Sequence, residues 1–200
     1  MIFSKIQMDV LNETKKFVKD YMNRLNDISH DYLHIKLVIK YSMKIARMEG
    51  IKNPRSLFHI TMGALLHDIG DHKYSNENQV KVLKKFLNKF RNLKRYDRDE
   101  IIRIASNVSL SKEDGKMMNR KLDVVKDADR INSLGAIGIM RYVSYNIINN
   151  EKPSFKEIIR NIRRRTMRIM RYLRTKSGRE IAIKHQNLVS LFLNNYRDFS

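Results

Sequence analysis

The spacing of apolar residues constrains the fold of this chain more than any other feature. Apolar side chains recur every three or four residues along almost the whole sequence, and convincing alternation with a period of two is absent. A repeat of about 3.6 residues is typical of helices that bury one face and expose the other. The pattern therefore predicts an all-α fold, a bundle of helices without a β-sheet.

Helix caps and helix breakers mark where these helices begin and end. One helix is expected from about residue 31 to residue 49, because Gly50 follows it and glycine is favoured just after a helix end. Asn53 and Pro54 predict the cap and the first turn of the next helix, which extends through Leu65.

Four further helix starts are predicted from capping residues: Ser75, Asp97 with Glu100, Ser154 with Glu157, and Ser177 with Glu180. Residues 122 to 149 are again helical in pattern, and Gly135 and Gly138 either break this segment or let another helix approach closely.

The length and composition predict a single domain. The chain has 200 residues, of which 42% are hydrophobic, and it contains no internal repeat or long linker. We expect residues 1–200 to form one domain, with a central region of about 28–145 and C-terminal helices of about 154–199 that pack on the same core.

The charge of the chain indicates what it binds. Its 41 lysines and arginines outnumber its 21 acidic residues and give a formal charge of +20, which favours phosphate-bearing partners such as nucleotides, nucleic acids or anionic lipids. With no cysteine, any metal must be held by nitrogen and oxygen ligands, as suits a reducing cytoplasm. Charges interrupt residues 1–20, so neither a signal peptide nor a membrane span is expected, and the oligomeric state stays open.

Residues 65–70, LLHDIG, place two polar side chains at the end of an apolar run. On a helix the neighbours His67 and Asp68 point about 100° apart, so both can reach one ion only from a helix end. Gly70 supplies such an end. Two ligands rarely complete a metal site, so this interpretation requires further ligands from distant parts of the chain.

Candidate ligands are present in other predicted helices. His34 lies on an apolar helix face, and the segment VVKDADRINSLGAIG carries Asp127 and Asp129. Imidazole and carboxylate together suit Mn, Fe, Co, Ni or Mg better than a structural zinc, and leave positions open for water and a phosphate oxygen. The alternatives are a hydrogen-bonded core histidine and a His-Asp pair that only caps its helix. Local periodicity does not choose between the two aspartates, which point about 200° apart.

The order of these segments resembles a known family. HDYLHIKLVIKYSMKIARMEG, GALLHDIGDHKY, VVKDADRINSLGAIGIMRYV and the C-terminal LRTKSGREIAIKHQNLVSLFLNNYRDF follow one another as in the HD-domain superfamily of metal-dependent phosphohydrolases. The chain is most similar to a small bacterial branch that hydrolyses nucleotides, including nucleoside triphosphates to monophosphate and pyrophosphate. The resemblance implies that this chain is a phosphohydrolase acting on a nucleotide or another phosphorylated small molecule.

The resemblance also implies roles for individual residues. It implies one divalent ion, manganese first and Mg, Fe, Co, Ni or Zn as alternatives, held by His34, His67, Asp68 and Asp129. Asp127 would then support the site or pair with Arg130. Catalytic roles are expected for Asp68 and Asp71, and substrate contacts for Lys73, Arg130 and His185; the alternative role of His185 is packing only.

The chain departs from the family pattern at three positions. Leu37 stands where these proteins often have an arginine, three residues after the first histidine, and Asn132 and Ser133 replace an acidic and a small apolar residue. We expect substrate contacts and substrate preference to differ accordingly.

Arginines 160, 164, 168 and 171 form a stripe at helical spacing near the C-terminus. The simplest interpretation of this stripe is the solvated face of an amphipathic helix. The alternatives are a positively charged surface that attracts nucleotides and a binding surface for RNA or DNA.

Two alternatives to a nucleotide pyrophosphohydrolase stay open for the whole chain. One is a nucleic-acid-binding protein with a structural or vestigial metal site, and the other is a phosphomonoesterase or second-messenger hydrolase of the same fold.

Overall fold

Helices make up most of the chain. The computed structural model describes residues 3–25, 31–70, 78–112, 119–149 and 154–198. The helices are α1 (Lys5–Leu25), α2 (Tyr32–Met48), α3 (Pro54–Leu66), α4 (Gln79–Leu87), α5 (Arg95–Ala105), α6 (Arg120–Asn132), α7 (Gly135–Asn149), α8 (Phe155–Tyr172) and α9 (Lys176–Asp198), with a short 3₁₀ turn at Leu110–Lys112. The predicted all-α fold is confirmed, since none of these described ranges contains a strand.

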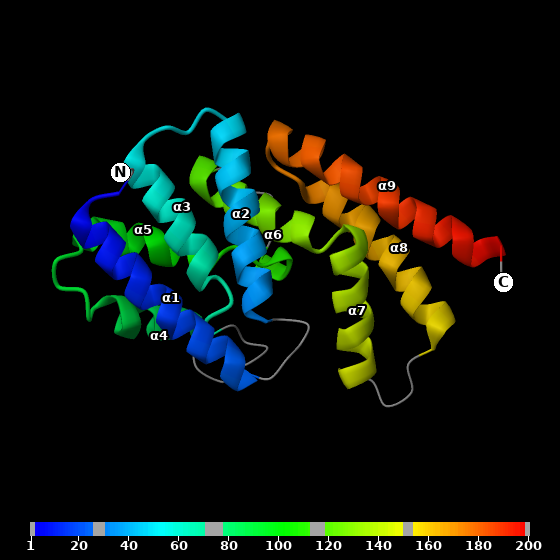
Figure 1. Cartoon of the computed structure of the whole chain (residues 1–200), viewed down its shortest axis with the longest axis horizontal. Coiled ribbons are helices and arrows are strands. Elements are labelled where there is room, and N and C mark those ends of the chain that lie inside the picture. Colours follow the sequence, from blue (N-terminus) through cyan, green and yellow to red (C-terminus); the bar gives the residue numbers. More distant parts are fainter. Residues whose placement is uncertain (1–2, 26–30, 71–77, 113–118, 150–153, 199–200) are drawn as a thin grey trace.

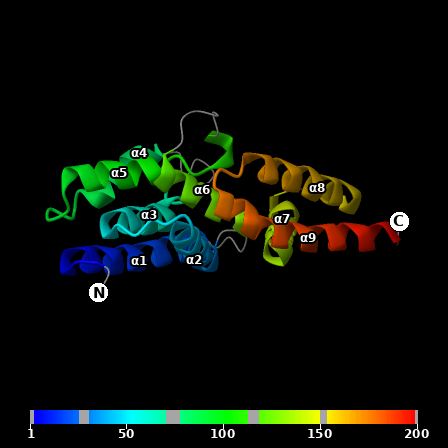
Figure 2. The same ribbon diagram turned by 90° about the horizontal axis from the view of Figure 1, so that it is seen from above.

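The molecule is elongated. Helices α1 to α5 lie at one end and α7 to α9 at the other, with α6 between them (Figures 1 and 2). None of the described helices is long and apolar enough to cross a lipid bilayer.

The predicted ends of α2 and α3 are confirmed. The carboxylate of Asp31 caps α2 by accepting a hydrogen bond from His34 N at 2.9 Å. Asn53 caps α3 by accepting a hydrogen bond from Ser56 N at 3.1 Å, and Pro54 opens the helix. Short polar side chains at these positions satisfy amide groups that have no partner inside the helix.

Two predicted caps are wrong. Helix α5 begins at Arg95, ahead of Asp97, whose carboxylate accepts hydrogen bonds from Arg55 and His59 instead. Helix α9 begins at Lys176, where Thr175 Oγ1 and not Ser177 accepts the hydrogen bond from Gly178 N, at 2.9 Å.

The other predicted caps have mixed outcomes. Ser154 precedes α8 as expected, but its side chain makes no capping hydrogen bond. Asn78 caps α4, while Ser75 lies outside the described residues. The predicted break falls at Gly135, whose φ of +67° turns the chain between α6 and α7.

Helix α3 runs through the middle of the packed helices. Every residue from Leu57 through Leu66 is buried, so the helix is covered on all sides. One apolar cluster joins it to α1, α4 and α5, and a second joins it to α2 and α6. The two clusters fix the end of α3, and therefore His67, against α2 and α6.

The C-terminal helices contribute to the second apolar cluster. Ile169 and Leu173 of α8 and Ile181 and Ala182 of α9 are buried in it. Helices α7, α8 and α9 also share a small cluster of their own, made of Ile139, Ile158, Ile162, Val189 and Leu193. The last third of the chain is thus attached to the helices that carry the candidate ligands.

Candidate metal centre

Helix α2 presents His34 to the interior from its first turn. Its backbone amide is held by the Asp31 cap, and the side chain is only 3% exposed. Asp31 is thus the N-cap of the helix that carries His34.

The turn after α3 presents His67 and Asp68. His67 is the C-cap of α3, and its Nδ1 donates to Ala64 O at 2.9 Å, which leaves the Nε2 lone pair directed into the site. Gln79 Nε2 donates to His67 O at 2.7 Å, and Gly70 ends the turn with a φ of +67°. A helix end is the geometry that lets neighbouring side chains converge.

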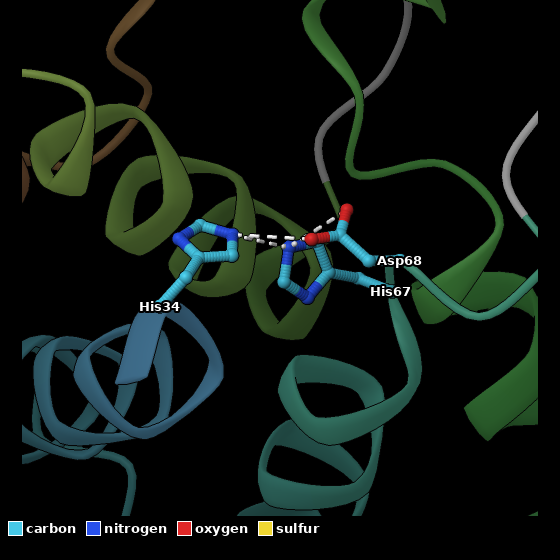
Figure 3. Close-up of side chains that lie close together, drawn as sticks. All are labelled: His34, His67 and Asp68. Atoms are coloured by element: carbon cyan, nitrogen blue, oxygen red, sulfur yellow. Dashed lines mark hydrogen bonds and ion pairs between the residues drawn. The ribbon is translucent and has the colours of Figure 1, made fainter. Parts of the chain in front are cut away.

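The two histidines and Asp68 converge from different helices, as Figure 3 shows. His34 Nε2 lies 3.2 Å from His67 Nε2 and 3.3 Å from Asp68 Oδ2, and His67 Nε2 lies 3.3 Å from Asp68 Oδ1. One atom from each residue falls within 4.8 Å of the others, as the donors of one metal ion do. Two imidazole nitrogens and a carboxylate form a donor set that fits a divalent ion.

Asp129 joins this cluster from α6. Its Oδ1 lies 3.5 Å from His34 Nε2 and 3.7 Å from His67 Nε2. The histidine side chains are almost fully buried, whereas that of Asp129 is 23% exposed. The cluster therefore reaches solvent beside a carboxylate, which leaves room for a water molecule or a substrate oxygen.

Asp127 points elsewhere and is completely buried. Its Oδ1 accepts a hydrogen bond from Arg174 N at 2.9 Å, and its Oδ2 accepts from Thr175 N and Thr175 Oγ1, both at 2.7 Å. Burial raises the pKa of Asp127, although these donors oppose the shift. Asp127 thus fastens the turn between α8 and α9 to α6.

Arg130 lies with Asp127 and not with the cluster. It is 2% exposed, its Nη1 donates to Tyr172 O, and that nitrogen lies 3.7 Å from Asp127 Oδ1. The expected ion pair with Asp127 is present, but the predicted substrate contact would require Arg130 to leave this buried position. Its burial argues against that role.

His185 contacts Tyr41 and lies beside the site. The hydroxyl of Tyr41 is 3.0 Å from His185 Nε2, and both residues line a cavity of about 210 Å³ together with Asn132. Asn132 also contacts His34, so this cavity adjoins the cluster. The predicted residues Asp71 and Lys73 lie outside the described residues, as does His72.

The electrostatics of the cluster distinguish its two histidines. Burial, reinforced by the charge of Arg141, lowers the pKa of His34 to about 4. Burial also acts to lower the pKa of His67, but Asp68 and Asp129 outweigh it and raise that pKa to about 9. The pKa of Asp129 is lowered because His67 and His34 outweigh its burial. A divalent ion would replace the proton that the imidazoles share, so protons and metal compete here.

Two contacts of His34 are not predicted by the sequence. Asn132 Nδ2 and Arg141 Nη1 each lie 2.6 Å from His34 Nδ1. A metal ion on Nε2 requires a hydrogen on Nδ1, and Asn132 can accept that hydrogen by presenting its amide oxygen. The guanidinium of Arg141 has only hydrogen-bond donors, so it must move away from His34 Nδ1 when that nitrogen carries a hydrogen. No motif around Arg141 indicates this position, because only the fold brings its side chain to His34.

Comparisons with known proteins agree with this geometry. The sequence matches the HD domain family over residues 31–134. It is 30% identical over 151 residues to an uncharacterised protein of Acanthamoeba polyphaga mimivirus, a match covering 69% of this chain and 62% of the viral protein. The chain thus spans less than two thirds of that relative.

Solved structures share the fold. The crystal structure of Bacillus subtilis YpgQ in complex with ADP superimposes with a TM-score of 0.77 and 20% identity, covering 98% of this chain and 97% of YpgQ. An HD-superfamily hydrolase from Bacillus thuringiensis superimposes with a TM-score of 0.73 and 23% identity, covering 96% of each chain. The family implies a divalent metal ion, and the cluster of His34, His67 and Asp68 could hold one. By its sequence match and its fold, this chain belongs to the HD domain family.

Proposed function

We propose that this chain is a metal-dependent phosphohydrolase that cleaves nucleoside or deoxynucleoside triphosphates to monophosphate and pyrophosphate. The observation that carries the proposal is the convergence of His34, His67, Asp68 and Asp129 at 3.2 to 3.7 Å from three separate helices. In this proposal these four residues hold one divalent ion, manganese in the first instance. The ADP bound to the structurally similar YpgQ supports a nucleotide as the substrate.

The donor set suits hydrolysis better than a structural role. A structural site encloses its ion, whereas this cluster opens to solvent at Asp129. When bound, the ion would polarise a phosphoryl oxygen and lower the pKa of a coordinated water. His67 keeps Nε2 aimed at the site through its bond to Ala64 O, and His34 is oriented by Asn132.

The remaining assignments concern water and phosphate. Asp71, four residues after His67, would orient the attacking water and accept its proton, with Asp68 as a second carboxylate beside it. Lys73 would neutralise phosphate charge that the ion does not reach. His185, in the neighbouring cavity, would contact the rest of the nucleotide.

Product analysis tests this proposal. Purified protein with Mn²⁺ is offered nucleoside mono-, di- and triphosphates, and phosphate and pyrophosphate are measured separately. We expect pyrophosphate from triphosphates, lost in His67→Ala and in Asp68→Ala together with the bound metal. His59→Gln is the matched control, because His59 is as buried as His67 and lies on the same helix.

Each other outcome has a defined meaning. Phosphate released from the monophosphates would indicate a phosphomonoesterase, and phosphate without pyrophosphate from the triphosphates would indicate cleavage of the terminal anhydride; either result would contradict the bond proposed here. Absence of product with every nucleotide and metal, combined with salt-dependent binding to RNA or DNA, would instead favour the nucleic-acid-binding alternative.

A further inference from the structure

The arginines of α8 are not equivalent. Ile158, Ile162 and Ile169 are the buried residues of this helix, and Arg165 comes three residues after Ile162 and four before Ile169. Residues at these spacings share one side of a helix. Arg165 therefore lies on the inward side, whereas Arg163, two residues earlier, points about 200° away.

Arg165 reaches from α8 to the end of α6. Its Nη2 donates to Ser133 Oγ at 3.1 Å, and its guanidinium lies 5.5 Å from the centre of the Tyr142 ring. Ser133 follows Asp129 by one helical turn and its hydroxyl contacts Asp129 O at 3.4 Å. The guanidinium is thus placed beside the helix end that presents the carboxylate of Asp129 to the cluster.

Charges around Arg165 are of both signs. Desolvation of its guanidinium lowers the pKa of Arg165, Arg141 and Arg168 lower it further, and Asp129 opposes them. The residue as a whole is exposed, and its guanidinium contacts Ser133 and Tyr142. Cationic groups from α7 and α8 therefore meet next to the cluster.

Arg141 of α7 reaches the same cluster at His34. Its Nη1 lies 2.6 Å from His34 Nδ1. Because an ion on His34 Nε2 requires a hydrogen on Nδ1, Arg141 has to rotate away from His34 in the loaded enzyme. Its guanidinium would then stay beside the site and be able to contact an anion bound there.

We infer that Arg165 and Arg141 form a clamp for the outer phosphates of a nucleoside triphosphate bound at the metal centre. This inference rests on the proposed function. Two carboxylates and one divalent ion leave almost no net charge, so the ion cannot neutralise a phosphate chain that carries several negative charges. Guanidinium groups supply the missing charge, and their planar donors match pairs of phosphate oxygens.

The inward placement favours a small nucleotide over a polymer. A nucleic acid would contact the arginines of the outer side of α8, such as Arg160 and Arg163; Arg165 is exposed like them but lies on the side of the buried isoleucines. Arg165 instead contacts Ser133 and Tyr142, close to the cluster. The clamp therefore explains one part of the arginine stripe and leaves the rest as a solvated face.

Binding measurements test the clamp without hydrolysis. The probes are ATP with a methylene group between its α- and β-phosphates, and AMP, each titrated calorimetrically in the presence of Mn²⁺. We expect Arg165→Gln to weaken binding of the triphosphate analogue by about 10-fold to 100-fold. Binding of AMP should change by less than about twofold, since the contact is to the outer phosphates.

Three further variants complete the test. Arg141→Gln should also weaken binding of the analogue and keep the bound metal. Arg165→Lys should recover part of the affinity. Arg163→Gln, which removes the same charge from the opposite side of α8, should bind both probes like the wild type. Melting temperatures measured alongside identify any variant that is misfolded.

The outcomes separate the clamp from the proposed function. Hydrolysis by the wild type with undiminished binding in Arg165→Gln would overturn the clamp and leave the function intact. Binding that depends on Arg165 without hydrolysis would support the clamp and contradict the function. Equal losses in Arg165→Gln and Arg163→Gln would reveal a diffuse charge effect and overturn the clamp, as would a wild type that binds no analogue.

Discussion

Helix α3 carries one buried histidine near its middle, His59, and another at its C-cap, His67, and the two differ sharply in their surroundings. His59 Nε2 lies 2.7 Å from Asp97 Oδ1, which also accepts a hydrogen bond from Arg55 Nε at 2.6 Å. His67 Nε2 faces another imidazole and the carboxylates of Asp68 and Asp129.

The difference lies in the number of donors for each carboxylate. Around His59 two donors serve one oxygen, so a carboxylate and a histidine satisfy each other and stabilise the fold. Around His67 two imidazoles and two carboxylates from separate helices converge, and a divalent ion can replace the proton that the imidazoles share. A histidine beside an aspartate thus has two outcomes, which only the remaining neighbours decide.

The largest expected effect separates the two aspartates of α6. Asp129→Asn should lower metal affinity or hydrolysis by at least about 100-fold, because it removes one of the converging carboxylates. Asp127→Asn should instead lower the free energy of unfolding by about 1–3 kcal/mol, since it weakens buried bonds to Arg174 and Thr175. Metal analysis and urea unfolding of both variants check this. If Asp127→Asn lost its metal and Asp129→Asn kept it, the metal ligand would be Asp127 and not Asp129.

The next effect concerns stabilisation by the ion itself. Mn²⁺ at about 100 times its dissociation constant should raise the free energy of unfolding of the wild type by about 2.7 kcal/mol. The same addition should leave His67→Ala unchanged, whereas His59→Gln should respond like the wild type. Thermal unfolding with and without the ion measures both differences. A similar response in all three proteins would mean that the ion binds elsewhere.

A smaller effect is expected around His59. Asp97→Asn should lower the free energy of unfolding by about 2 kcal/mol, because it removes the charge that the buried His59 and the exposed Arg55 share. Metal content should stay at the wild-type level. Should this variant lose its metal while remaining folded, the surroundings of His59 and His67 could not be independent.

The smallest effect depends on pH. Arg103 and Lys121 bind Glu100 and outweigh its burial, so they lower its pKa from 4.5 to about 2. A lowered carboxyl pKa stabilises the fold fully above pH 4.5, and this contribution disappears as the pH falls through about 2.

The comparison of wild type with Glu100→Gln isolates this contribution. Glu100→Gln should be less stable than the wild type by about 1 kcal/mol at pH 7, with a difference that shrinks toward zero at pH 2. Urea unfolding at several pH values measures it. A difference that grows as the pH falls would show that the sign is wrong.

Local signals in the sequence predict some helix ends and not others. Asn53 caps α3 as expected, and Asp31 caps α2 at the expected start of that helix. Asp97 has the right residue type for a cap, but Arg55 and His59, about 40 residues earlier, bind its carboxylate. Such competition comes from tertiary structure, which a local motif does not contain.

The candidate site, too, could be predicted from the sequence only in part. The order of His34, His67 and Asp68 is visible in the sequence, and the fold brings the three together. Choosing between Asp127 and Asp129 from local spacing is impossible, because the partners of Asp127 lie 47 and 48 residues later in the chain. Arg165 could have been singled out, since its spacing from the buried isoleucines already places it on the inward side.

The attachment of Asp127 to Arg174 and Thr175 has a consequence for biosynthesis. These residues tie α6, which carries Asp129 two positions further on, to a turn near the end of the chain. During translation, α6 therefore lacks this anchor until the segment after residue 175 has left the ribosome. We expect α6 to reach its final position beside α2 and α3 only after this segment has been made, so the proposed metal centre would be completed late in synthesis.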